Sequence, residues 1–205
     1  MTPPLSEHHC QNIDTYDLDK FFQRGIEKGS HVLIVGESPA PNGWRISGKA
    51  CYTTAGKLLP TGQRLNELLK PFNLSVEVCG FTELAKCFVG KDRKLLYNCA
   101  KTCWPIFIKQ LRKNDIKIII FLGVKTLEIF NKLNQSNLIV GKLATTEIAG
   151  RDYSILPIYH PSPINPTGRA KNLTIFTQNK TKLVKYTNTA GSSNGRTPHS
   201  ECGDF

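Results

Sequence analysis

The sequence predicts an α/β fold, a three-layer α/β/α sandwich around a mainly parallel central sheet of roughly four strands. Two observations support this prediction. Short apolar runs with strand character alternate along the chain with longer segments of helical periodicity. The run Lys117–Leu122, "KIIIFL", is the plainest buried strand, because β-branched residues dominate it and Gly123 follows it. We therefore expect this run to form a central parallel strand.

The other elements follow in chain order. Three further apolar runs are expected to be strands: Val32–Val35, Val76–Phe81 and Tyr153–Tyr159. Helical spacing of apolar residues predicts helices over Thr61–Lys70, Lys94–Lys113, Val124–Leu133 and Ala170–Lys185. Thr61 can cap the first of these helices, and Pro105 should kink the second or begin a new segment.

Three polar side chains fall just beyond predicted strand ends. Glu37 and Glu83 each follow a strand in the first half of the chain, and His160 follows the last one. Ligands of parallel α/β sheets bind at the carboxyl ends of the strands. The sequence therefore predicts one site that combines two carboxyl groups and an imidazole.

The length of 205 residues fits a single folded domain over residues 31–188. Residues 1–30 are expected to be an N-terminal extension, and the small, polar residues 189–205 a disordered tail. No apolar stretch approaches the length of a membrane span, and the acidic N-terminus does not resemble a secretory signal. Seven cysteines, an odd number, favour a reducing intracellular compartment, the cytoplasm or nucleoid. A monomer is expected.

The net charge of +11 is unevenly placed. Residues 1–30 carry five acids and three bases, so the excess of positive charge lies in the remainder of the chain. The stretch Pro161–Asn188 contains five bases and no acid. Such a basic region suits a phosphate polyanion, and we expect a nucleic acid rather than a membrane as the partner. The alternative is a generic basic surface that keeps the protein in solution.

Two loop motifs resemble those of the uracil-DNA glycosylase superfamily. "GESPAP" at Gly36–Pro41 resembles its first motif and "HPSP" at His160–Pro163 its last, in the same order and at matching strand ends. The segment "TGQRLNELLKPFNLSVEVCGFTELAKC" resembles the iron–sulfur (family 4) type. The resemblance extends from about Val32 to Lys185 and implies a DNA glycosylase that flips a base out of the duplex.

The resemblance also implies residue roles. Glu37 would orient the attacking water and favour the cationic sugar, and His160 would hydrogen-bond the departing base. Ser162 would contact a phosphate, with the loops stiffened against DNA by Pro39, Pro161 and Pro163. Arg169, just past the last motif, would anchor another phosphate. Each polar residue also has a structural interpretation: Glu37 as a cap, His160 and Ser162 as turn residues, and Arg169 as a solvated charge.

The sequence departs from the superfamily pattern at the base-binding positions. The usual phenylalanine that stacks on the base is missing, and Tyr52 lies at about the right distance from Glu37 to replace it, with Trp44 as the rival. Otherwise Tyr52 is a loop aromatic that packs on the core. Glu83 takes the place of an asparagine that reads the base. It is either protonated, turned away, or matched to a base other than uracil.

The cysteines of the iron–sulfur type are incomplete. Cys87 and Cys103 match the last two ligands, but only Cys10 lies in the region of the first pair, beside His8 and His9. Because such clusters normally need four thiolates, we expect no cofactor, and Cys87 and Cys103 to be buried remnants. A 4Fe–4S cluster held by three cysteines and a histidine is the alternative.

Three functions remain open at this stage. The leading hypothesis is a monofunctional DNA glycosylase that removes uracil or a related deaminated base by water attack, without a lysine Schiff base. The second is a non-catalytic relative that binds nucleic acid. The third is a hydrolase of small N-glycosides, against which the positive charge argues.

Overall fold

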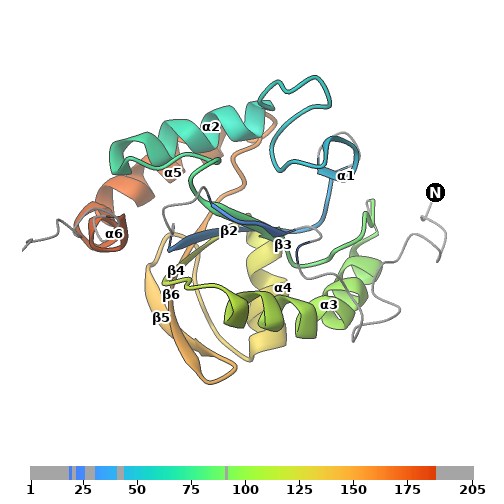
Figure 1. Ribbon diagram of the computed structural model, residues 1–205. Helices are drawn as coiled ribbons and strands as arrows, with labels where there is room; N and C mark the ends of the chain where they lie inside the picture. Colours follow the sequence, from blue (N-terminus) through green and yellow to red (C-terminus); the bar gives the residue numbers. More distant parts are fainter. Residues whose placement is uncertain (1–18, 20–21, 26–30, 41–43, 91, 188–205) are drawn as a thin grey trace, which may run out of the picture.

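The structure, a computed structural model, describes residues 19, 22–25, 31–40, 44–90 and 92–187. Six strands of this part of the chain form one sheet in the order β1-β3-β2-β4-β6-β5 (Figure 1). They are β1 (Phe22–Gln23), β2 (Val32–Gly36), β3 (Gly80–Glu83), β4 (Ile118–Leu122), β5 (Ala144–Ile148) and β6 (Arg151–Ile158). The four central strands are mutually parallel, whereas β1 and β5 add to the two edges in antiparallel orientation.

The four central strands lie close to the predicted ones, with one shift. β3 begins at Gly80 rather than Val76. The reason is local: the Ser75 hydroxyl accepts from the backbone N–H groups of Glu77 and Val78, and this Ser-turn competes with a strand. The prediction of about four strands was too low, because the edge strands β1 and β5 escaped it. β1 has two residues, and β5 is the polar stretch "ATTEI".

The helices are α1 (Trp44–Ser47), α2 (Pro60–Leu69), α3 (Arg93–Lys113), α4 (Val124–Asn134), α5 (Pro166–Gln178) and α6 (Lys180–Thr187), with a 3-10 turn over Lys70–Phe72. Thr61 does not cap α2, which starts at Pro60 without a side-chain cap. Pro105 lies inside α3, which continues as one helix to Lys113. The single C-terminal helix that was expected is two helices, separated at Asn179.

Helices cover both faces of the sheet and bury a separate core on each (Figure 1). Successive residues of β4 point to opposite faces, as the period of two requires. Ile119 and Phe121 pack in the cluster beneath α3 and α4, whereas Ile118 and Ile120 pack in the cluster beneath α2, α5 and α6. The central strands are therefore buried on both faces, which explains their continuous apolar runs.

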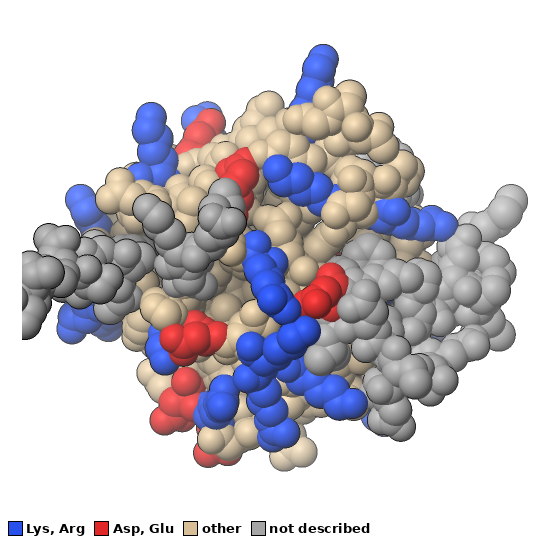
Figure 2. Space-filling view, viewed as in Figure 1, with Lys and Arg blue, Asp and Glu red and all other residues tan. Residues whose placement is uncertain are grey.

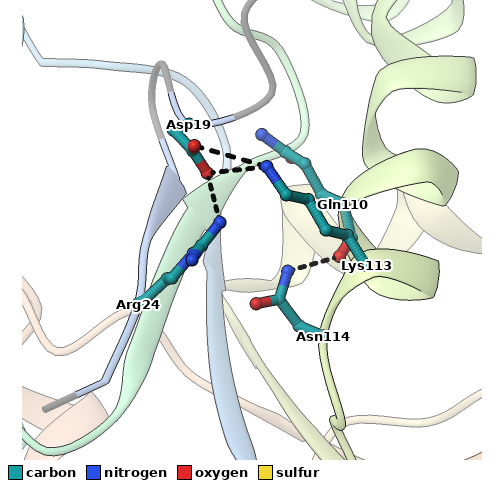
Figure 3. A network of polar contacts seen from close by, with 5 residues as sticks. All are labelled: Asp19, Arg24, Gln110, Lys113 and Asn114. Atoms are coloured by element: carbon teal, nitrogen blue, oxygen red, sulfur yellow. Dashed lines mark hydrogen bonds and ion pairs between the residues drawn. The ribbon is translucent and has the colours of Figure 1, made fainter. Parts of the chain in front are cut away.

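The first described residues join the sheet to α3. Asp19 accepts from Arg24 at 2.9 Å and from Lys113 on α3 at 3.3 Å, and Asn114 donates to the backbone carbonyl of Gln110 at 2.8 Å (Figure 3). β1, which pairs with β3, lies within the stretch expected to be an extension. Part of residues 1–30 therefore belongs to the sheet, whereas residues 189–205 lie outside the described residues. No helix in the described part of the chain combines the length and apolar character that a membrane crossing requires.

Candidate active site

A cavity of about 470 Å³ opens at the carboxyl ends of the central strands. Four lining residues come from the ends of the four parallel strands: Glu37 follows β2, Glu83 ends β3, Gly123 follows β4, and His160 lies beyond β6. The structure thus brings together the two carboxyl groups and the imidazole that the sequence placed at strand ends. The volume lies in the range of about 300–1,000 Å³ typical of small-molecule sites.

Backbone pairing continues past the strand ends and holds the two carboxyl residues side by side. Gly36 is in register with Glu83 in the parallel β2–β3 pair. Beyond that pair, Leu84 N–H donates to Gly36 O and Ala85 N–H to Glu37 O, both at 3.0 Å. The first motif is therefore tied to the segment after β3, and Glu37 is held where it lines the cavity.

The Glu83 side chain lies in the space that the absent side chain of Gly36 leaves free. A Cβ on Gly36 would lie 2.0 Å from Glu83 Oε2. Glu83 is only 7% exposed, and its Oε2 has no hydrogen-bond partner among the described residues. Burial raises the pKa of the Glu83 carboxyl to about 8, against the attraction of Lys86 and with a further contribution from Glu37. Glu83 is consequently a neutral acid over much of the physiological pH range.

A completely buried lysine lies beneath Glu83. Lys86 is 0% exposed, and its Nζ donates to Thr82 Oγ1 at 2.6 Å, to the Glu83 backbone carbonyl at 2.6 Å, and to Gln110 Oε1 at 2.7 Å. A buried ammonium group is tolerated only when its donors are satisfied in this way. The network connects α3 to β3 and fixes the backbone from which Glu83 extends.

His160 lies against the loop that begins α4. A Cβ built on Gly123 would be 3.3 Å from His160 Cβ, and Gly123 has a φ of +99°, which favours glycine. The His160 side chain is exposed through the mouth of the cavity. The surrounding protein atoms still desolvate the ring and lower its pKa. The imidazole is therefore neutral near pH 7 and can donate from one ring nitrogen.

The comparison with known families agrees with this geometry. The family model of the uracil DNA glycosylase superfamily matches residues 23–184, well over half of the chain. The chain belongs to the uracil DNA glycosylase superfamily. Members of this superfamily are DNA glycosylases, which are hydrolases that act on DNA. The match begins within β1 and ends in α6, so it includes every element that contributes to the cavity.

Two aromatic rings of this superfamily domain line the cavity, and Tyr52 is not one of them. Trp44, the rival candidate, lines it together with Phe81, and the two rings meet edge to face with centroids 5.4 Å apart. Tyr52 instead packs on the core, with Lys49 Nζ 3.9 Å from its ring centroid. The neighbouring Cys51, which has a positive φ of 63°, lines the cavity in its place.

The last motif is fixed in place by contacts with α2 and α5. Arg64 of α2 donates to the Ser162 backbone carbonyl at 2.9 Å, and the Asn165 side chain caps α5 at Gly168 N. Pro161 is buried, and Pro163 is exposed. Neither Ser162 nor these prolines line the cavity, and the same is true of the buried Pro39 in the first motif. Their predicted DNA contacts would therefore lie outside this cavity.

Arg169 also lies outside the cavity lining. Its guanidinium forms an ion pair with Glu67 of α2 at 3.0 Å, and both side chains are about half exposed. Lys and Arg side chains are spread over the face shown in Figure 2, and the largest group of them lies below its centre. The helix α3 alone contributes the exposed basic residues Lys94, Lys101, Lys109, Arg112 and Lys113.

The cysteines that match the iron–sulfur type are buried together. Cys87, Cys99 and Cys103 share one core cluster, and the backbone N–H of Lys86 donates to Cys103 Sγ at 3.3 Å. A hydrogen bond with Cys87 lowers the pKa of Cys99, against the effect of burial. Cys10, His8 and His9 lie outside the described residues, within which no group of donors suits a metal ion. These thiols alone do not supply the four that a cluster needs, so no step of the chemistry is assigned to one.

Sequence reasoning missed several residues around the site. Phe81 was assigned only to a strand, Lys125 only to a helix, and Cys51 to no role, yet all three line the cavity. The signal for Lys125 was available, since it follows Gly123 at a strand end, where ligands bind. Ile164, which is 92% exposed directly after the last motif, was also missed. Among the large apolar residues of the described structure, it is the most exposed.

Proposed function

We propose that this protein is a monofunctional DNA glycosylase that hydrolyses the N-glycosidic bond of uracil or a related deaminated base. The observation that carries the proposal is that Glu37 and His160, 123 positions apart in the sequence, line one cavity at the carboxyl ends of the sheet. A base inside a duplex is out of reach of such a cavity, so the nucleotide is extruded into it.

Glu37 acts on the sugar side of the bond. Cleavage develops positive charge on the sugar, which a carboxylate favours, and the same carboxylate orients the water that attacks the sugar carbon. Because its backbone carbonyl is bound by Ala85 N–H, Glu37 is positioned before the substrate arrives. This positioning lowers the entropic cost of reaching the reactive geometry.

His160 acts on the base side. The electrons of the broken bond pass to the departing base, whose carbonyl oxygens become more negative. A neutral imidazole donates a hydrogen bond to such an oxygen, and desolvation lowers the His160 pKa in the direction that keeps the ring neutral. The base leaves as an anion that later takes a proton from solvent.

Aromatic and loop residues would hold the DNA. Trp44 and Phe81 offer ring surfaces to the base, and stacking of this kind is worth roughly 1–3 kcal/mol per base. Ser162 and Arg169 would contact phosphates outside the cavity. The exposed Ile164 is suited to enter the base stack as an apolar wedge while the nucleotide is extruded.

The lysines near the site support water rather than an amine as the nucleophile. Lys86 Nζ donates to three acceptors beneath Glu83, and Lys125, which lines the cavity, pairs with Glu128. A Schiff base would form a covalent complex that borohydride traps. We expect no trapped complex between the protein and uracil-containing DNA.

The test is a cleavage assay. Oligonucleotides carrying uracil, hypoxanthine or xanthine are incubated with the protein, treated with alkali and examined for strand breaks. We expect cleavage of at least one of them and a loss of roughly 10²- to 10⁴-fold in Glu37→Ala. Glu147→Ala, which changes an exposed carboxylate on the edge strand β5, should leave the rate unchanged.

Other outcomes separate the competing functions. Tight binding of these oligonucleotides without cleavage would establish the non-catalytic relative. Cleavage of free nucleosides but not of oligonucleotides would establish the small-molecule hydrolase. Equal activity of Glu37→Ala and the wild type would refute the role assigned to Glu37.

A further inference from the structure

One polar group in the wall of the cavity has no hydrogen-bond partner within the described structure. Glu83 Oε2 is buried, and Glu83 as a whole is only 7% exposed, yet the side chain borders the cavity. Leaving a buried polar atom without a partner costs roughly 1–3 kcal/mol. Such a group in a native protein calls for an explanation, and a ligand that enters the bordering cavity would provide one.

We propose that Glu83 reads the extruded base as a neutral carboxylic acid, accepting a hydrogen bond from an N–H of the base and donating one to the adjacent carbonyl oxygen. This inference rests on the proposed function of the cavity and concerns which bases it accepts. A protonated carboxyl presents one acceptor and one O–H donor side by side, whereas a carboxylate only accepts. It therefore offers the same pair of functions as a primary amide.

The matching ligand is a base with an N–H next to a carbonyl group. Uracil presents N3–H beside O4, and hypoxanthine presents N1–H beside O6. An ionised Glu83 would face the carbonyl oxygen with like charge, and the base would lose one hydrogen bond and gain a repulsion. Recognition of such bases should therefore depend on the proton of Glu83.

The groups that face Glu83 influence the protonation of its carboxyl, and two of them titrate in other pH ranges than Glu83 does. Glu37 from the β2 loop opposes a second negative charge, and Lys86 from beneath attracts one. Burial and the two carboxyl neighbours Glu83 and Glu77 raise the pKa of Cys51 to about 12. The pKa of His160 is lowered by desolvation. The pKa of His160 therefore lies below the mildly alkaline range and that of Cys51 above it, so neither obscures the titration of Glu83. Lys125 is the remaining charged residue that lines the cavity.

The first experiment compares the pH dependence of uracil excision in the wild type and Glu83→Gln. Glutamine keeps the donor and acceptor at every pH, so it is a matched control without the proton. In the wild type, kcat/KM should fall roughly tenfold from about pH 7 to about pH 9. In Glu83→Gln it should be within about threefold of the wild type at pH 7 and lose this decline. Ionisation of uracil itself affects both proteins alike.

Two results would overturn the inference. One is a parallel alkaline decline in both proteins. The other is a folded Glu83→Gln that cleaves no substrate while the wild type does, since that would show that the carboxylate charge is required. If neither protein cleaves any substrate, the proposed function fails. The inference about Glu83 is then tested by the pH dependence of oligonucleotide binding.

The binding measurement uses an oligonucleotide with 2′-fluoro-2′-deoxyuridine, in which the fluorine disfavours the cationic sugar and slows cleavage. Its affinity for the wild type, measured by fluorescence anisotropy, should fall about tenfold from about pH 7 to about pH 9, and that for Glu83→Gln should not. Infrared spectra of the wild type with ¹³C-labelled glutamate provide a measurement without any variant. We expect a carboxylic C=O band at pH 7 that disappears on alkaline titration. If no such band is present at pH 7, the inference is overturned.

Discussion

The cavity has two polar walls, the β3 wall with Glu83 and the β6 wall with His160. Desolvation shifts the pKa values of these two groups in opposite directions. On the β3 wall, desolvation raises the pKa of Glu83 to about 8, whereas on the β6 wall it lowers the pKa of His160. Removal from water disfavours whichever form is charged, so an acid retains its proton and a base loses one. The same physical effect thus supplies two neutral hydrogen-bonding groups on opposite sides of one cavity.

The walls differ in how they are supported. Glu83 extends from a strand that is fixed from below by the buried Lys86 and its bonds to Thr82 and Gln110. His160 extends from a loop that Arg64 holds through the Ser162 carbonyl, and its side chain is exposed. We infer that the β3 wall is the rigid reading surface and the β6 wall the one that acts on the leaving base.

Of the two walls, the β6 wall is expected to give the larger effect. Substitution of His160 by alanine should lower the excision rate roughly 10²- to 10³-fold, since removing one donor from a developing oxyanion costs about that much. Stability should change little, because the side chain is exposed. The measurement is single-turnover excision of uracil. His31→Ala, at the opposite end of β2 beside Asp115, should retain full activity, and a similar loss in both variants would contradict this assignment.

The next effect tests the β3 wall without altering Glu83. Gly36→Ala places a Cβ where it meets Glu83 Oε2 at 2.0 Å, so the carboxyl must move out of its position. We expect a loss of about 1–3 kcal/mol of stability from the steric conflict, and at least a roughly tenfold loss of uracil excision. Urea denaturation and single-turnover kinetics measure the two.

Two controls sharpen this prediction. Gly80→Ala lies at the other end of β3, where the nearest atom is the end of the Leu33 side chain at 3.1 Å, so its cost should be smaller. In a Glu83→Ala background the added Cβ of Gly36→Ala meets no carboxyl, and its stability cost should largely disappear. Persistence of the full cost there would show that the backbone, and not Glu83, resists the substitution.

The central strands and the position of the cavity followed from the sequence because both depend on short-range patterns. The runs around Ile34, Ile120 and Leu156 are buried on both faces and read as continuous apolar segments. The rule that ligands bind beyond the carboxyl ends of parallel strands then placed Glu37, Glu83 and His160 together. No long-range information was needed for this step.

The details that failed depend on contacts that a linear pattern does not contain. Tyr52 and Cys51 are neighbours in the chain, and nothing in the linear pattern indicates that Cys51 rather than Tyr52 lines the cavity. The alternating polar residues of β5 give no apolar run, because one side of that edge strand faces solvent. Nothing in the linear pattern indicates that Lys86 is buried, because its three acceptors come from positions 82, 83 and 110 and meet only in the folded chain.

A separate prediction concerns how the stability of the folded protein depends on pH. Glu83 has a folded-state pKa of about 8, above its ordinary value of 4.5. Between these values the unfolded chain releases the proton and the folded chain keeps it, so stability falls as pH rises, by at most about 1.4 kcal/mol per pH unit, and levels off above pH 8. Glu83→Gln should lack this component, which urea denaturation from about pH 5.5 to about pH 9 would reveal. Identical slopes in the two proteins would place the Glu83 pKa near its ordinary value.

The smallest effect distinguishes the two roles of Arg169. Its ion pair with Glu67 is half exposed, so Arg169→Ala should cost no more than about 1 kcal/mol of stability. A phosphate contact would appear instead in DNA binding, as a decrease of roughly one in the slope of log affinity against log salt. Arg151→Ala, an exposed arginine at the start of β6 and thus at the end of the sheet away from the cavity, is the control and should leave the slope unchanged. If Arg169→Ala leaves the salt slope intact and costs the same stability as Glu67→Ala, the residue serves only to join α5 to α2, and the phosphate contacts must come from elsewhere on the basic surface.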